Sequence, residues 1–279
     1  MSKFKEYLKH PFSLILRILI GLCALITVAS VLFIIFYILF KGVPNLTTDL
    51  FSLKYNSENV SMLPSIINTV TITFLTLLIA VPVGVFSAIY LVEYAKKGSK
   101  LVKVIRVTTE TLAGIPSIVF GLFGFLAFVI ALGWGYSMIA GVLTLVLMVL
   151  PTIIRTTEEA LLAVPDTYRE GSFGLGAGKL RTIFKIILPS AVNGILSGVI
   201  LAIGRIVGES AALIFTAGTF AETATSLMAS ARTLSVHLYC LLTEGLYTNQ
   251  AYATAVVLLL LVVGINALSN LVAKKIAKV

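Results

Sequence analysis

Cysteine, histidine, tryptophan and charged residues are all scarce in this chain. Its 279 residues include two cysteines, two histidines and one tryptophan, and only 12% of them are charged. The two cysteines, Cys23 and Cys240, lie far apart in the sequence and at different expected depths, so we expect no disulfide between them. So few cysteines and histidines also exclude a disulfide framework and a cysteine-rich metal cluster. We therefore expect no metal site in this chain.

A nucleotide-binding loop is missing as well, although one stretch looks like one at first sight. Residues 172–182 read SFGLGAGKLRT. A P-loop needs G-x-x-x-x-G-K-[ST], because its backbone amides surround the phosphates and its hydroxyl binds Mg²⁺. Here Phe173 stands at the first glycine position and Leu180 follows Lys179, and the preceding residues have the composition of an amphipathic helix rather than of a buried strand. We therefore expect that this chain does not hydrolyse ATP by itself.

Apolar residues, by contrast, are abundant: they make up 58% of the chain, and the mean hydropathy is +1.05. A soluble domain of this size could not bury so much apolar surface, so the composition predicts an all-α integral membrane protein. The net charge of +9 and the pI near 9.6 would suggest nucleic acid in a soluble protein. The positions of the charges decide between the two interpretations.

Six apolar stretches are long enough to cross a hydrocarbon core of about 30 Å as helices. With both termini in the cytoplasm, the inner segments hold 17 Lys and Arg residues and the outer segments hold three. This bias supports six spans in one membrane domain over residues 1–279, and no nucleic-acid partner is needed to explain the charge. The first run is too long for a signal-peptide core, so we expect it to be a span. The expected spans are Ile18 to Phe40, Ile66 to Val92, Thr111 to Leu132, Tyr136 to Ile154, Ala191 to Phe215 and Ala251 to Ala273.

The cytoplasmic loop over residues 155–190 is long for a compact bundle. It contains a helix-like run from Thr156 to Val164, a stop at Pro165, a glycine cluster, and a second run from Lys179 to Leu188 with apolar residues at helical spacing. The glycines permit a sharp chain reversal and close approach of another backbone. We expect an elbow of two short helices that docks on a partner. The alternative is a loop that lies at the membrane interface without a partner.

The residues of this loop resemble the EAA loop of ATP-binding-cassette (ABC) importer permeases. Glu170, Gly171 and Gly176 match E-A-A-x-x-x-G, with small residues in place of the two alanines, and nine residues later Ile186, Leu188 and Pro189 match I-x-L-P. In that family the loop inserts into a cleft on a separate ATPase subunit. The resemblance implies that these residues couple the chain to its ATPase.

Four further segments are similar to the phosphate-specific members of this family, and the last two point to the PstA-type subunit. The resemblance, over about residues 66–273, implies a six-helix bundle of the type I ABC importer permease kind in the inner membrane. It also implies a PstC-type permease partner, a pair of ATP-binding subunits that hold ATP and Mg²⁺, and an extracytoplasmic phosphate-binding protein. The segments are residues 113–121 (AGIPSIVFG), 204–210 (GRIVGES), 235–239 (SVHLY) and 249–255 (NQAYATA).

Arg205 and Glu209 are the charged residues inside the fifth expected span. A charge at mid-membrane costs roughly 2.5–3.5 kcal/mol on insertion scales and usually faces a bundle interior or a water-filled path. Residues four apart share one face of a helix, so we expect both side chains to line a path. Our hypothesis is that Arg205 attracts an oxyanion and that Glu209 accepts a hydrogen bond from its P–OH group. The alternative is an internal ion pair that fixes helix packing. The expected face continues through Gly198, Ala202, Ala212 and Thr216.

Several residues are candidates for lesser roles. Pro82, Gly114 and Pro116 interrupt expected spans, where a transporter could hinge or gate, although such residues are more often tolerated kinks. His237 lies in an outer loop, and we interpret it as a surface histidine rather than a ligand.

Three alternatives to an ATP-driven phosphate importer remain at this point. One is a permease for another oxyanion, such as sulfate, molybdate or phosphonate. Another is an ATP-independent ion-coupled carrier in which Glu209 is a proton site. The last is a membrane scaffold, which has difficulty explaining charges inside a span.

Overall fold

The computed structural model describes residues 11–96 and 98–276, and every regular element in these ranges is helical. Five helical runs are long and apolar enough to cross a membrane, and one bent pair of helices brings the number to as many as six. The predicted class, an all-α membrane protein with six spans, is therefore confirmed. Five of the lysines in the charge count lie outside the described residues: Lys3, Lys5, Lys9, Lys97 and Lys278.

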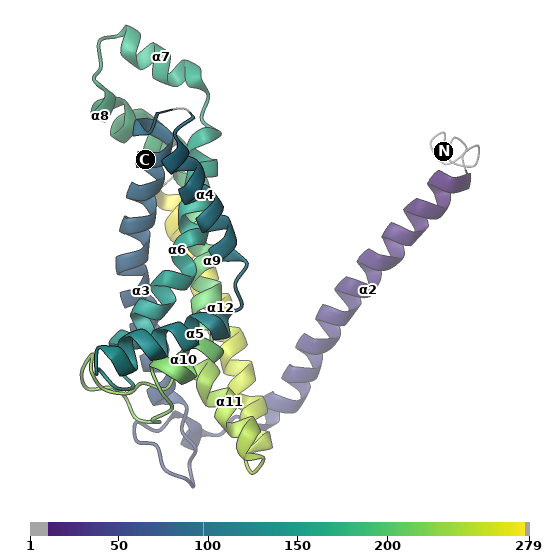
Figure 1. Ribbon diagram of the computed structural model, residues 1–279. Coiled ribbons are helices and arrows are strands. Elements are labelled where there is room, and N and C mark those ends of the chain that lie inside the picture. The colour runs from purple at the N-terminus through teal and green to yellow at the C-terminus, as the bar shows by residue number, and fades with distance from the viewer. Residues whose placement is uncertain (1–10, 97, 277–279) are drawn as a thin grey trace.

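The helices follow one another with short connections, except for a long loop after the first helix and another after α10 (Figure 1). Two single turns, η1 (Val43–Asn45) and η2 (Thr48–Phe51), lie in the first of these loops. The remaining elements are α2 (Pro11–Gly42), α3 (Leu63–Ile89), η3 (Tyr90–Tyr94), α4 (Lys100–Ala113), α5 (Ser117–Gly124), η4 (Phe125–Ala131), α6 (Met138–Leu162), α7 (Asp166–Gly174), α8 (Lys179–Thr182), η5 (Ile183–Ile187), α9 (Leu188–Val207), α10 (Ala211–Thr216), α11 (Leu234–Glu244) and α12 (Thr248–Ile276).

The third span is not the straight helix expected from Thr111 to Leu132. The run Lys100–Ala113 and the run Ser117–Ala131 are bent by 103° relative to each other. Gly114 ends α4, and Pro116 immediately precedes α5. Proline has no backbone N–H to donate and disfavours a helical conformation at the preceding residue. The two residues singled out as a possible hinge therefore lie at the bend.

The fifth span is also shifted from its expected bounds. Its helical run extends from Lys179 to Val207, whereas the expectation was Ala191 to Phe215. The run begins early because η5 joins α8 to α9 without a break, and Pro189 lies in the first turn of α9, where its missing N–H is tolerated. It ends early because the chain leaves the helix after Val207 at Gly208 and starts again as the short helix α10.

The core forms around α6. Leu145, Met148 and Ile153 of this helix are almost completely buried, within an apolar cluster that also takes residues from α3, α5, α9, α10 and α11. Gly84 of α3 lies directly against Ile153, so a Cβ atom there would clash. Small residues let membrane helices approach closely, and here they bring α3 against α6. Pro82 lies nearby, inside a helix that continues without a break.

The first helix, α2, stands apart from this bundle (Figure 1). Its most apolar stretch has no buried residue within the structure. Only its end meets α12, where Gly42 lies against the Tyr252 backbone and the rings of Tyr37 and Tyr252 contact each other. The apolar surface of α2 is thus uncovered in this chain alone.

Candidate anion path and coupling elbow

Arg205 lines a cavity between three long helices. The cavity also takes Thr152 from α6, Gly204 from α9 and Asn266 from α12. Thr152 and Asn266 lie well inside their helices, away from both ends, so the cavity lies within the membrane-spanning part of the bundle. The structure therefore places the half-buried Arg205 beside a cavity at depth, where Thr152 and Asn266 are the other polar side chains of the lining.

Two polar groups of this cavity lack partners. The Arg205 guanidinium forms no hydrogen bond and no ion pair with any residue that the structure describes. The Asn266 Oδ1 atom is buried, and it too has no hydrogen-bond partner. Unpaired polar groups at depth are costly, so these two are suited to a ligand, water or a neighbouring subunit.

Glu209 does not share a helix face with Arg205, so that prediction is wrong. The residue follows the end of α9, and its Oε1 atom accepts a hydrogen bond of 3.0 Å from the Ala212 amide in the first turn of α10. Its carbonyl oxygen accepts a hydrogen bond of 2.6 Å from the Ser235 hydroxyl. Because none of the ion pairs among the described side chains joins Glu209 to Arg205, the alternative of an internal pair is not observed either. Glu209 instead fixes the break between two helices.

The stripe of small residues expected to line the path packs inside the bundle instead: Gly198 of α9 lies against α6, and Ala212 and Thr216 lie in α10, against α5. A Cβ atom at Gly198 would clash with the Thr156 side chain, and Ala202 is fully buried. The α9 part of the stripe brings this helix close to α6, and Arg205 lies beside this contact rather than along it.

The elbow protrudes from one end of the bundle as α7 and α8 (Figure 1). Its first helix is α7, not the expected run from Thr156 to Val164, which is the end of α6. The reason is that Pro165 and Asp166 begin a helix here rather than stop one: a proline fits the start of a helix, and an acidic residue in its first turn is favourable.

The residues of the EAA-like pattern divide into two groups. Glu170, Gly171, Gly176 and Pro189 are exposed. Gly176 has φ +81°, a left-handed conformation that favours glycine. The remaining two, Ile186 and Leu188, pack on the buried cluster that joins the elbow to α3 and α6.

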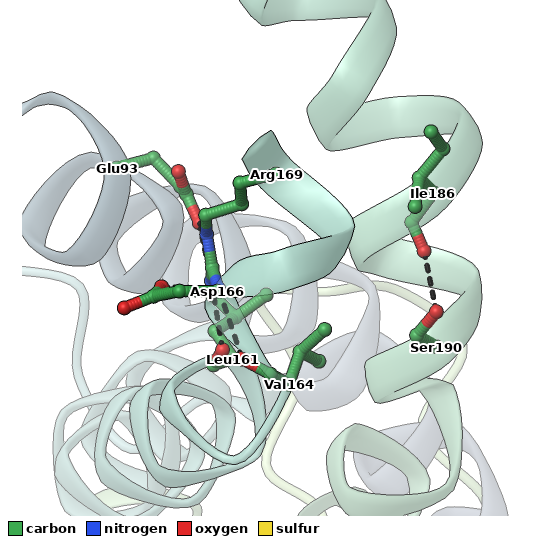
Figure 2. Close-up of polar contacts among 7 residues, drawn as sticks. All are labelled: Glu93, Leu161, Val164, Asp166, Arg169, Ile186 and Ser190. Carbon is green, nitrogen blue, oxygen red and sulfur yellow. Dashed lines mark hydrogen bonds and ion pairs between the residues drawn. The ribbon is translucent and has the colours of Figure 1, made fainter. Parts of the chain in front are cut away.

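Ile186 also takes part in a local hydrogen bond. Its carbonyl accepts a bond of 2.7 Å from the Ser190 hydroxyl, which Figure 2 shows. This bond lies at the start of α9, where the elbow joins the fifth span.

Large apolar side chains are exposed on the elbow and on η5, which follows it. Leu175 is 92% exposed, and four others are about half exposed or more. Large exposed apolar side chains on one segment are typical of an interaction site. The four others are Tyr168, Phe173, Leu180 and Phe184.

Arg169 holds this elbow to the bundle, as Figure 2 shows. Its Nε and Nη2 atoms donate to Glu93 Oε1 at 3.0 and 2.8 Å, and Nη2 also donates to the Leu161 carbonyl at 3.0 Å. Its Nη1 atom donates to the Val164 carbonyl at 2.9 Å and to Asp166 at 3.1 Å. Sequence reasoning counted Arg169 only as an inner charge, although its position beside Glu170 is a signal that could have drawn attention to it.

A second polar assembly joins α3 to the loop that follows α10. Asn68 of α3 donates to the carbonyls of Glu222 and Arg232 and accepts from the Ala224 amide. His237 is completely buried, beside Arg232 and against the edge of the Tyr55 ring. The interpretation of His237 as a surface residue is therefore wrong, because Tyr55 and Arg232, from the two long loops, lie against its ring.

The two cysteines, Cys23 and Cys240, are both free, as expected. No group of three or more potential metal ligands occurs among the residues for which coordinates are described.

Comparison with known proteins agrees with this arrangement. Residues 80–278 match the model of the family described as "binding-protein-dependent transport system inner membrane component". The chain is 37% identical over 241 residues to the probable ABC transporter permease protein YqgI of Bacillus subtilis, covering 81% of this chain and 82% of that protein. It is 33% identical over 262 residues to the phosphate transport system permease protein PstA of Yersinia pestis, covering 90% and 88%.

A solved structure shares the fold. A chain of a bacterial ABC transporter involved in the import of the acidic polysaccharide alginate superposes with a TM-score of 0.68 at 17% identity, over 98% of this chain and 99% of that one. The predicted fold of an ABC importer permease is thereby confirmed. Together with the family match, it follows that the chain belongs to the binding-protein-dependent transport system inner membrane components, the permease subunits of ABC importers.

Proposed function

We propose that this chain is the PstA-type permease subunit of an ATP-driven importer of inorganic phosphate. In this proposal it lies in the cytoplasmic membrane with both termini inside and forms half of the path together with a PstC-type subunit. A pair of ATP-binding subunits holds ATP and Mg²⁺, so this chain is not an enzyme and carries no cofactor. An extracytoplasmic phosphate-binding protein delivers the substrate. Relatives named as phosphate permeases support this choice of substrate.

The observation that carries the proposal is the unpartnered Arg205 in a cavity within the membrane. A charge at membrane depth without a counter-ion is unfavourable unless water, a neighbouring subunit or a ligand compensates it. A guanidinium offers planar paired donors that suit a tetrahedral oxyanion. Thr152 and Asn266 line the same cavity and extend the polar lining. We therefore assign the anion path to the side of the bundle where α6, α9 and α12 meet.

Asn266 suits a protonated oxyanion in particular. Its buried Oδ1 atom lacks a donor, and phosphate near neutral pH carries at least one P–OH group that can supply one, whereas sulfate carries none. Glu209 stays in the proposal as a positioning residue: it holds the chain break that ends α9 just after Arg205, and it is not among the residues that line the cavity.

The elbow supports an ATP-driven mechanism over an ion-coupled carrier. Its exposed apolar side chains and Glu170 need a partner outside the membrane, which an autonomous carrier does not require. A Cβ atom at Gly171, Gly174 or Gly178 would meet nothing in this chain, so packing within the chain does not explain these glycines. Close approach of an ATPase subunit does. In the proposal, Glu170, Gly171, Gly176, Ile186, Leu188 and Pro189 form or shape this contact.

The bend at Gly114 and Pro116 is the natural place for a gate. Two short helical segments with different directions meet there, and such breaks allow one half to move against the other. Pro82, inside the unbroken α3, is a weaker hinge in this scheme.

The substrate is tested by competition. Vesicles that contain this chain with its partner subunits and binding protein take up labelled phosphate upon addition of ATP, and a hundredfold excess of sulfate, molybdate or phosphonate is added in parallel. We expect an excess of unlabelled phosphate to abolish the uptake of labelled phosphate, and we expect the other anions not to do so. Full competition by sulfate or molybdate, or uptake of these anions in place of phosphate, would replace the phosphate assignment by that of another oxyanion.

A further inference from the structure

Both short helices of the elbow rest on one turn of the membrane bundle. That turn is η3, a π-helical continuation of α3 at its cytoplasmic end. From α7, Arg169 binds Glu93; from α8, the Lys179 ammonium lies 4.6 Å from the centre of the Tyr94 ring. Two neighbouring residues of η3, Glu93 and Tyr94, thus contact the two helices of the elbow.

The Arg169–Glu93 pair is well shielded from water. Its side chains are 15% and 9% exposed, whereas those of the neighbouring pair Arg155–Glu159 are 56% and 64% exposed. Exposed pairs contribute little, while removal of one partner from a buried pair leaves an uncompensated charge. Because Arg169 also donates to the carbonyls of Leu161 and Val164, it joins α7 to η3 and to the end of α6.

The receiving turn is continuous with a membrane span. The run Leu63–Tyr94 forms one span in which η3 follows α3 directly. The Ala95 amide closes the turn on the Tyr90 carbonyl at 2.9 Å. π-Helical turns occur frequently at functional sites. A displacement of α7 would therefore reach α3 through this turn.

The elbow has a second connection to the bundle, through the chain itself. From α8 the backbone continues through η5 into α9, and Ile183 and Ile187 of η5 are buried against Ala88, Ile89 and Leu161. Any movement of the elbow is thus passed to α9 covalently and to α3 through side chains.

We propose that η3 is the transmission element of this transporter. Through Glu93 it receives the movement of Arg169, so that α3 moves together with α9 when the ATPase subunits pull on the elbow. Arg169 and Glu93 are positioning residues: they touch neither the transported anion nor ATP. This inference rests on the proposed importer function and adds to it the route by which the elbow drives the spans.

The test compares Arg169→Gln, Glu93→Gln and the double variant with wild type, and Arg155→Gln is the matched control because it breaks the exposed pair. Three quantities are measured on the complete complex: retention of the ATPase subunits during purification, the rate of ATP hydrolysis, and the uptake of labelled phosphate. We expect each single variant to retain the ATPase subunits within twofold and to lower the phosphate transported per ATP hydrolysed at least tenfold. The double variant should be no worse than the more severe single one, because both changes remove one contact. Arg155→Gln should stay within twofold of wild type.

Two results would overturn the inference. One is an unchanged ratio of phosphate to ATP in both single variants. The other is a loss of the ATPase subunits from Glu93→Gln, because the pair would then serve docking rather than transmission. Failure of the proposed function gives a different result: wild-type vesicles would accumulate another oxyanion instead, and the ratio measured with that anion would still test η3.

Discussion

Acid should destabilise the fold around α11 through His237. Its ring is completely buried, outside the segments long enough to span the membrane. The pKa of His237 is lowered from 6.5 to about 4, first because burial disfavours the charged ring and second because Arg232 repels it, while the Val60 backbone works in the opposite direction. The folded protein therefore holds this histidine neutral.

The sign and size of the effect follow from these two values. Between pH 6.5 and about 4 the unfolded chain binds a proton at His237 and the folded chain does not, so acid favours unfolding over this window. The stability from the neutral ring is fully present above pH 6.5, falls as the pH drops, and is lost below the folded pKa. At about 1.4 kcal/mol per pH unit, the loss is about 3 kcal/mol.

The assay is the melting temperature of the purified chain in detergent micelles, measured from pH 7 to pH 4 for wild type and His237→Gln. Wild type should lose roughly 10 °C more than the variant over this range, for a fold of this size. The variant is expected to be less stable at pH 7, but it lacks the titrating ring, so its curve should be flatter. Parallel curves for the two proteins would refute the reasoning.

Three further changes have defined outcomes. Gly198→Val should destabilise the contact of α9 with α6 by about 1–3 kcal/mol, because its Cβ would meet Thr156; Gly204→Ala, where a Cβ meets nothing, should leave the melting temperature unchanged, and equal effects would contradict the packing argument. Asn68→Ala should speed amide hydrogen exchange over residues 217–233, since three hydrogen bonds to that loop are lost, at about 1 kcal/mol each; protection equal to wild type would refute this role. Gly176→Ala should weaken retention of the ATPase subunits about fivefold, because an alanine at φ +81° costs about 1 kcal/mol; retention unchanged in pull-down would show that the elbow tolerates another backbone conformation there.

The class of fold was predictable because hydropathy reports which segments leave water. It does not report whether a helix is straight. The summed hydropathy of Thr111 to Leu132 is that of one straight span, yet the chain bends by 103° at Gly114 and Pro116. The sequence carried the signal for this break, but hydropathy averaging conceals it.

The site was predictable only in part. Arg205 was identified because a charge inside an apolar run is conspicuous in the sequence. The prediction that Arg205 shares a helix face with Glu209 was wrong. A spacing of four residues implies a shared face only while the helix continues, and α9 ends at Val207. The contact of Arg169 with Glu93 joins residues 76 positions apart, and no local pattern predicts such a pair. The burial of His237 likewise depends on distant residues that fold over it.

The central claim is that an anion path at Arg205 and a coupling elbow at Glu170 are separate parts of one ATP-driven importer. The most direct test is ATP-dependent uptake of labelled phosphate into vesicles that hold this chain with its partner subunits and binding protein, for wild type, Arg205→Ala and Glu170→Ala. We predict that wild type accumulates phosphate only with ATP, that both variants lose uptake, and that only Glu170→Ala also loses the ATPase subunits. Uptake that ignored both ATP and the Glu170 change would contradict the claim and identify the chain as an autonomous carrier.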